Sequence, residues 1–214
     1  GLLMCYQSDA VGEEEWKLGQ RGIEEGLAVK NLSAAAVRKM QPKANLNIKG
    51  AVYFDSDAHM TPSDFMPQMI THLKSKGVVF YANETVKDIV VSEGKITSVL
   101  TNKQTLNTDE VVLAAGSWSP ILTKKLDIKI PIQAGKGYRI DVPRETGITI
   151  PAILCEAKVA VTPMEGFTRF AGTMEIAGIN HKVNPTRVNA IAKAAQNYYQ
   201  NLEVAAAEKE NAEC

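Results

Sequence analysis

The sequence predicts an α+β fold, in which helices pack on an antiparallel sheet and part of a separate α/β lobe stands beside it. Two β-rich stretches, residues 86–101 and 159–175, each fold back around a tight turn that contains glycine, and paired strands of this kind build antiparallel sheets. A third stretch, VVLAA at residues 111–115, is an apolar run typical of a strand buried on both faces of a parallel sheet. With 214 residues, 45% of them hydrophobic, the chain can bury a sizeable core.

Strands and helices alternate in the first part of the chain. Residues 1–6 and 51–54 are rich in β-formers and predict short strands. Residues 13–25 predict a helix, because acidic side chains stand in its first turn, where the helix dipole favours negative charge. Ser33 is a typical N-cap for a second helix, which Pro42 stops.

A third helix and further strands are expected in the middle of the chain. Thr61-Pro62 predicts the start of this helix and Gly77 its end. Its apolar face comprises Phe65, Met69, Ile70 and Leu73. Three antiparallel strands follow, one at residues 78–83 and two on either side of a hairpin turn at residues 92–95, ahead of the buried strand VVLAA.

We expect these elements to divide into several regions. Residues 1–55 and 128–184 form the two parts of the region that holds the main antiparallel sheet, and residues 56–127 form the partial lobe. Asn184-Pro185 starts a last helix over residues 185–202. Residues 203–214, EVAAAEKENAEC, are predicted to be a disordered tail.

Composition excludes several classes of function. The chain carries 24 basic and 24 acidic residues, so it lacks the basic surface that binds nucleic acid. Its three cysteines stand far apart, which excludes a CxxC motif and fits a reducing cytoplasm. The three histidines have no ligand partners at metal-binding spacing, so no metal site is expected. No apolar run is long enough to predict a transmembrane segment.

The strongest local sign of a binding site is Ala114-Ala115-Gly116, at the end of the apolar run. Small residues at the carboxyl end of a parallel strand let a cofactor approach main-chain N–H groups. Close packing between the strand and its crossover explains the same residues equally well. GKGYRI at residues 135–140 is no phosphate loop, because it lacks a third glycine and follows Pro131 rather than a buried strand.

Three ordered stretches resemble the flavin-dependent D-amino-acid dehydrogenase and glycine oxidase family. Residues 109–119 are similar to the family pattern DxVVLAAGxWS, a strand that runs under the FAD. Residues 131–138 and 172–178 are similar to PxxGxGY and GGTxEIxG, which belong to the substrate domain, although Ala171 stands where the family often has a glycine. The resemblance extends over roughly residues 1–200.

This resemblance implies that the chain is an internal part of a longer enzyme. Family members begin with a GxGxxG segment that holds the FAD pyrophosphate and end with a WxGxRP segment that closes the flavin and substrate pocket. Neither pattern occurs in this sequence. We therefore expect the complete enzyme to bind FAD, and this chain by itself to be inactive and without the cofactor.

By the same resemblance, the complete enzyme oxidises a D-amino acid or a glycine-like amine. The Cα hydride passes to the flavin, and water hydrolyses the imino acid to a 2-oxo acid and ammonia. No catalytic acid or base is expected from this chain, since the amine can bind in its neutral form. The protein supplies orientation and a clamp for the substrate carboxylate, usually an arginine with a tyrosine hydroxyl.

Four residues are candidates for contact with the substrate: Tyr138, His59, Arg169 and Met174. Each has a structural alternative. Tyr138 is equally the type of aromatic residue that fills a core, His59 stands at a helix start where histidines are commonly solvated, and hairpin arginines such as Arg169 often face water. Met174 and its neighbour Glu175 alternate along a strand, so only one of them points inward.

Five residues are candidates for contact with FAD. Val86 matches a position whose main chain meets the adenine in the family. Ala114, Ala115 and Gly116 match the strand end beside the pyrophosphate and ribityl chain, and Trp118 packs under the flavin domain. Lys136 and Lys158 are expected to be solvated.

A competing hypothesis is a stand-alone substrate-binding or interaction module that has lost its redox function. Both hypotheses imply a small amino acid as ligand. An unpaired VVLAA strand would expose an edge that favours a homodimer. We expect a cytoplasmic protein. The sequence leaves open whether the complete enzyme also contacts a membrane at its surface to reach a quinone.

Overall fold

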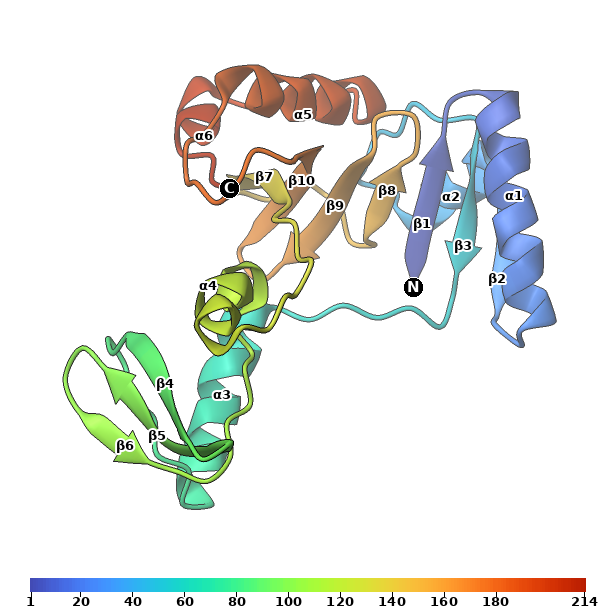
Figure 1. Cartoon of the computed structure of the whole chain (residues 1–214). Helices are drawn as coiled ribbons and strands as arrows, with labels where there is room; N and C mark the ends of the chain where they lie inside the picture. Colours follow the sequence, from blue (N-terminus) through green and yellow to red (C-terminus); the bar gives the residue numbers. More distant parts are fainter. The chain divides into compact units, whose positions relative to one another are not determined.

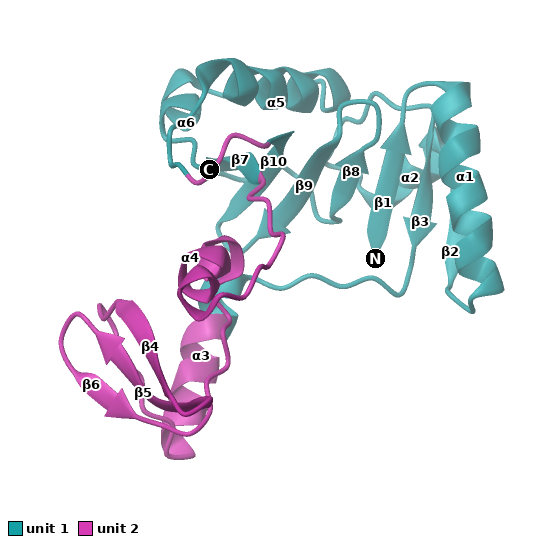
Figure 2. Cartoon of the chain, viewed as in Figure 1, with its two compact units in different colours: residues 1–65, 136–175, 180–214 teal, residues 66–135, 176–179 magenta.

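The computed structural model describes all 214 residues, which form two compact units. Unit 1 comprises residues 1–65, 136–175 and 180–214, and unit 2 comprises residues 66–135 and 176–179 (Figure 2). The expected α+β fold is confirmed. The boundaries of the units lie later in the chain than the expected boundaries after residues 55 and 127, because the first strand of the second part of unit 1 begins only at Lys136.

Unit 1 is built on a seven-stranded sheet in the order β2-β3-β1-β8-β9-β10-β7 (Figure 1). Its strands are β1 (Leu2–Tyr6), β2 (Val29–Ser33), β3 (Gly50–Phe54), β7 (Lys136–Val142), β8 (Ala152–Leu154), β9 (Val159–Met164) and β10 (Phe167–Glu175). Neighbouring strands are antiparallel except β1 and β8, which are parallel. The predicted hairpin around Glu165-Gly166 joins β9 to β10, and Gly166 takes the left-handed conformation that this turn requires.

Helices cover both faces of this sheet. On one face lie α2 (Ala34–Met40) and α5 (Pro185–Tyr198), and α5 packs on β7, β9 and β10. The core lies beneath them, and it includes Leu3 and Cys5 of β1, Ala51 of β3 and Ile191 of α5. As predicted, Ser33 is the N-cap of α2 and accepts a hydrogen bond from the backbone N–H of Ala36 at 3.3 Å.

The first helix, α1 (Asp9–Glu24), covers the opposite face at β1, β2 and β3. It begins earlier than predicted because Ser8 serves as its N-cap. Its internal glycines weaken the sequence prediction of a helix, but close packing requires them. A methyl group at Gly12 would lie 2.6 Å from the ring of Tyr6, and one at Gly19 would lie 2.9 Å from Val52.

Unit 2 contains a three-stranded antiparallel sheet in the order β4-β5-β6. Its elements are β4 (Val86–Ser92), β5 (Lys95–Thr101), β6 (Thr105–Asn107), η1 (Gly116–Trp118), α4 (Ser119–Thr123), η2 (Lys124–Leu126) and most of α3 (Pro62–Ser75). The predicted hairpin turn is confirmed, since Glu93 and Gly94 both have positive φ angles, of 52° and 76°. No helix of either unit is long and apolar enough to cross a bilayer.

Two expectations for unit 2 are wrong. Residues 78–83 form no strand. The apolar run at residues 111–115 forms no strand either, because no other strand lies beside it to provide hydrogen bonds, and Val112 is 92% exposed. The helix expected between Thr61-Pro62 and Gly77 is confirmed as α3, although none of its residues is buried.

The expected disordered tail is also ordered. Residues 203–214 include α6 (Ala206–Glu210), and Ala212 is buried. Glu213 forms a two-way backbone pair with Arg139 of β7, with N···O distances of 2.9 and 3.1 Å. Glu208 forms an ion pair with Arg144 at 2.5 Å. The tail is therefore held because it extends the edge of the sheet, a non-local contact that its polar composition does not reveal.

The carboxylate of Glu156, in the turn between β8 and β9, joins three parts of unit 1. One oxygen accepts hydrogen bonds from the backbone N–H groups of Gln7 and Ser8, both at 2.9 Å, and from the Ser8 hydroxyl at 3.0 Å. The other oxygen accepts one from the hydroxyl of Tyr198, at the end of α5. Burial raises the pKa of Glu156, but these donors outweigh it and hold the pKa below the usual value of 4.5.

We expect Glu156→Gln to lower the free energy of unfolding by about 1–2 kcal/mol. The amide keeps the shape but loses the charge that these donors stabilise, and partial exposure to water limits the loss. Urea denaturation at pH 7 measures it. Glu165→Gln, in the exposed turn between β9 and β10, is the control and should leave the unfolding midpoint unchanged. Equal stability of the Glu156→Gln variant and the parent would contradict this role.

Candidate functional site

Unit 2 contains a cavity of about 790 Å³, and four of the five predicted FAD residues line it. Val86 is the first residue of β4, Ala114 and Ala115 end the extended run, and Trp118 ends η1. These residues are far apart in the sequence, and the fold of unit 2 brings them together. The fifth, Gly116, follows Ala115 directly but does not line the cavity.

The small residues at this cavity are not packed against other parts of this chain. Gly116 has a φ of 52°, and a methyl group added to it would meet no atom within 4 Å. Ala114 is exposed. The backbone at residues 114–116 is therefore open to an approaching group.

The chemistry of the cavity suits a largely apolar ring system. Beside the alanines it presents Val99, Val111, Leu113 and Ile121. Trp118 is 50% exposed, so its indole face is available, and it does not pack under other elements as expected. Of the two lysines that line the cavity, Lys125 is engaged, since it donates to the Lys87 carbonyl at 2.7 Å and lies 3.8 Å from Asp88, whereas the exposed side chain of Lys87 has no such partner. The residues present fit the apolar part of a flavin and provide no cradle for phosphates.

Unit 1 contains a second cavity, of about 900 Å³, at β7 and β10. Three of the four predicted substrate residues, Tyr138, Arg169 and Met174, line it. His59 does not. Its imidazole is exposed, and Nε2 lies 3.0 Å from the carbonyl of Pro163, at the turn end of β9.

Two of the three lining residues, Tyr138 and Arg169, are already constrained. Tyr138 is only 2% exposed and belongs to the core, with Lys136 Nζ 5.2 Å and Arg187 Cζ 6.0 Å from its ring centroid. Its hydroxyl forms no hydrogen bond. The guanidinium of Arg169 is bound by Asp141 through two hydrogen bonds of 2.8 Å, so it does not simply face water.

A bulge in β10 decides which of Met174 and Glu175 turns inward. The register with β7 shifts between Gly172 and Glu175, and Thr173 takes a φ of 54°. As a result the Glu175 side chain is only 15% exposed, whereas Met174 is 75% exposed. Met174 lines the cavity from its rim, and Glu175 is the inward residue.

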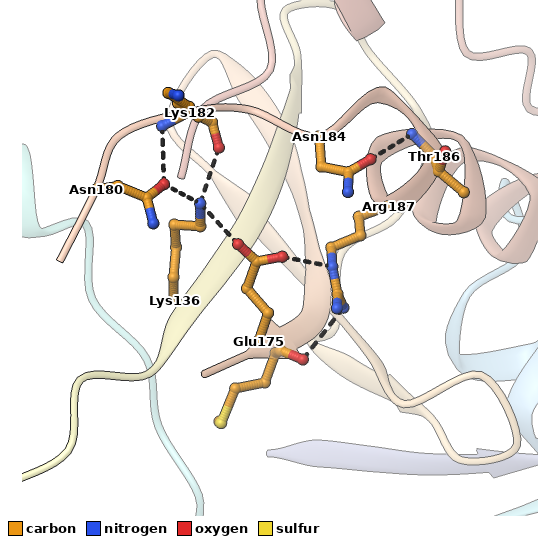
Figure 3. A network of polar contacts seen from close by, with 8 residues as sticks. Lys136, Glu175, Asn180, Lys182, Asn184, Thr186 and Arg187 are labelled. Atoms are coloured by element: carbon orange, nitrogen blue, oxygen red, sulfur yellow. Dashed lines mark hydrogen bonds and ion pairs between the residues drawn. The ribbon is translucent and has the colours of Figure 1, made fainter. Parts of the chain in front are cut away.

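Glu175 is the centre of a polar network that joins β7, β10 and α5 (Figure 3). One oxygen pairs with Lys136 Nζ and the other with Arg187 Nε, both at 2.8 Å. Lys136 also donates to Asn180 Oδ1 at 2.7 Å and to the Lys182 carbonyl at 2.8 Å. The expectation that Lys136 is solvated is therefore wrong, since its side chain is 10% exposed.

The network shifts both partners' pKa values. The hydrogen bond to Glu175 raises the pKa of Lys136, although burial opposes it. The hydrogen bond from Lys136 lowers the pKa of Glu175. Both residues therefore stay charged at neutral pH, and the ion pairs hold the start of β7, the end of β10 and the start of α5 together.

Sequence reasoning missed Arg139 as a residue of the second cavity, and Lys158, which is exposed as expected, also lines it. Arg139 follows the candidate Tyr138 in the chain, and its positive charge could have marked it as a possible partner of a carboxylate. Lys158 stands in the turn before β9 with a φ of 52°, a conformation that its residue type does not reveal.

Comparison with known proteins places the whole chain in one family. The family described as "FAD dependent oxidoreductase" matches residues 1–212. D-amino acid dehydrogenase of Helicobacter pylori is 27% identical over 206 residues, which cover 95% of this chain and 49% of the relative. D-amino acid dehydrogenase of Bradyrhizobium diazoefficiens is 34% identical over 134 residues, 61% of this chain and 31% of the relative. The chain spans about half the length of the former relative.

Solved structures show the same fold. Glycine oxidase from Bacillus cereus superposes with a TM-score of 0.81 at 23% identity, over 94% of this chain and 55% of that one. Glycine oxidase from Geobacillus kaustophilus gives a TM-score of 0.83 at 18% identity, over 100% of this chain and 56% of that one. Both units therefore have counterparts in these proteins.

We expect the stability that Glu175 provides to depend on pH. A carboxylate whose pKa is lowered in the folded state contributes fully above its ordinary pKa of 4.5 and loses that contribution as the pH falls through the lowered value. Urea unfolding of the parent and of Glu175→Gln should therefore differ at pH 7 and converge below about pH 4.5. Glu24→Gln, on the exposed surface of α1, serves as the control. A difference that stays constant across this range would contradict the ion-pair assignment.

Proposed function

The chain belongs to the family of FAD-dependent oxidoreductases, and from this premise we propose that it is about half of an enzyme that oxidises D-amino acids or glycine-like amines to 2-oxo acids and ammonia. One observation carries the proposal. Val86, Ala114, Ala115 and Trp118, selected from the sequence as FAD contacts, line a single cavity. The names of the relatives, D-amino acid dehydrogenase and glycine oxidase, support the same class of substrate.

In this proposal the cavity of unit 2 holds part of FAD. The backbone at residues 114–116 admits the cofactor, since no side chain beyond a methyl group blocks it there. Val86 and Trp118 provide apolar surface on either side. Bound FAD would accept the hydride from the substrate Cα. The phosphates require donors from outside this chain, because no glycine-rich phosphate loop occurs in its sequence.

The cavity of unit 1 is the proposed substrate side. Met174 at its rim and Tyr138 at its base exclude water from an apolar part of the ligand. The bidentate pair with Asp141 already satisfies Arg169, which therefore shapes the cavity wall rather than clamping a carboxylate. His59 lies outside this cavity, so the proposal assigns it no contact with the substrate.

We also propose a cytoplasmic location and a homodimer for the complete enzyme. All three cysteines are free, in agreement with a reducing compartment. The exposed apolar run at residues 111–115 supports association with another strand, from the rest of the enzyme or from a second copy.

We expect the protein expressed from the uninterrupted reading frame that encodes this chain to contain FAD and to react with D-amino acids. Anaerobic addition of D-alanine should bleach the flavin absorbance near 450 nm, and L-alanine should not. A flavin-free protein that still binds D-alanine would instead support the alternative, a binding module without redox activity. A flavin that no amino acid reduces would overturn the proposed reaction.

We expect Ala115→Leu in the same protein to lower the affinity for FAD about tenfold, because the larger side chain fills the space beside the backbone. Overpacking of this kind costs about 1–3 kcal/mol, and 1.4 kcal/mol corresponds to a factor of ten. Flavin content after gel filtration, with fluorescence titration of the apoprotein, measures the loss. Ala82→Leu adds the same side chain at an exposed turn of unit 2 and should bind FAD as the parent does. If Ala115→Leu and Ala82→Leu bind FAD with equal affinity, this cavity is not part of the FAD site.

A further inference from the structure

The second cavity, in unit 1, has an unusual charge balance. Three basic side chains line it, Arg139, Lys158 and Arg169, and no aspartate or glutamate does. Its remaining lining is uncharged in its side chains and consists of Gly137, Tyr138, Ala157, Ala171, Gly172, Thr173, Met174 and Cys214. A cavity with this lining attracts negative charge, provided that at least one of the cations is available to a ligand.

Arg169 is not available. Its Nε and Nη2 atoms donate to the two oxygens of Asp141, both at 2.8 Å, and its side chain is 21% exposed. These hydrogen bonds raise the pKa of Arg169 and occupy the Nε–Nη2 edge of its guanidinium. A ligand would have to break a bidentate pair that is fixed between two neighbouring strands, β7 and β10.

Arg139 is available. Its Nη2 pairs with the carboxylate of Glu213, and its Nε lies 3.9 Å from Asp141, buried and without a hydrogen bond. Glu213 is 64% exposed, so the pair lies at the surface, where an ion pair contributes only about 0–1 kcal/mol. A carboxylate from a ligand in the cavity can therefore replace that of Glu213 at small cost.

Resting on the function proposed above, we propose that the cavity selects acidic amino acids and that Arg139 is the residue that determines this specificity. In the structure the carboxylate of Glu213 pairs with the guanidinium of Arg139, at the position that the ligand's second carboxylate would take. The backbone pair between Arg139 and Glu213 need not change, because it involves only main-chain atoms.

The charges explain why an acidic ligand is preferred. A neutral amino acid offers one carboxylate and cannot satisfy a second cation, and a basic amino acid brings a further positive charge next to Lys158 and Arg139. An acidic amino acid offers a second carboxylate. A guanidinium matches that group through parallel N–H donors.

Isothermal titration calorimetry of the purified 214-residue chain tests this directly, with D-glutamate and D-glutamine as probes of nearly equal size. We expect D-glutamate to bind about tenfold more tightly than D-glutamine, the ratio for one charge-assisted hydrogen-bonded pair. Arg139→Gln should abolish the ratio, and Arg139→Lys should keep part of it. Circular dichroism confirms that both variants fold.

Matched charge-removing variants separate the local contact from the overall charge. Glu213→Gln frees Arg139 and should tighten D-glutamate binding up to about fivefold, the size of an exposed ion pair. Glu145→Gln also removes an exposed carboxylate, 2.9 Å from Lys43 at the other end of β7, and should change nothing. If Glu213→Gln and Glu145→Gln tighten D-glutamate binding equally, the gain comes from the change in net charge and not from the contact with Arg139.

Two outcomes overturn the proposal: binding of neither probe by the parent and by Glu213→Gln, or a preference for D-glutamate that survives in Arg139→Gln. Neither outcome depends on FAD or on turnover, because the titration measures binding by this chain. Failure here would leave the flavin reaction to its own test. If the protein prefers D-glutamate but no amino acid reduces its flavin, the proposed anion site is supported and the proposed oxidation reaction is refuted.

Discussion

The carboxylate of Glu156 is the constraint on which unit 1 depends. It lies in a turn between two strands of the main sheet, yet its hydrogen bonds reach the start of α1 and the end of α5, which lie on opposite faces. A carboxylate at the amino end of α1 also matches the positive end of that helix. One group therefore links the start of α1 and the end of α5 to the turn between β8 and β9, whereas β7 and β10, which border the second cavity, are held by their own antiparallel ladder.

The two units differ in how far they complete their own packing. Unit 1 buries an almost continuous core beneath α2 and α5. Unit 2 buries little, and its apolar residues at Val79, Val112 and Ile121 are largely exposed. A chain that spans about half of a relative's length is expected to leave such a surface where the other half would pack. The cavity that we propose for part of FAD lies in this less completely packed unit.

Features set by neighbouring residues could be predicted from the sequence, and features set by distant ones could not. The turn at Glu93-Gly94 and the cap at Ser33 are local, and both occur as predicted. The strand at residues 111–115 needs a partner strand, and no local pattern reveals that none is present. For the same reason the motifs selected residues that line two cavities, whereas the partners of Arg169 and Arg139, which lie across strands or in the tail, are seen only in the structure.

The backbone pair between Arg139 and Glu213 bears on the solubility of the chain as well as on its sites. β7 is the last strand of its sheet, and an outermost strand presents unpaired N–H and C=O groups that can recruit strands of other molecules. The final residues cover part of that edge with the chain's own backbone. They thereby limit edge-to-edge pairing along this stretch of β7, and removal of a few terminal residues would both open the edge and take Ala212 out of the core.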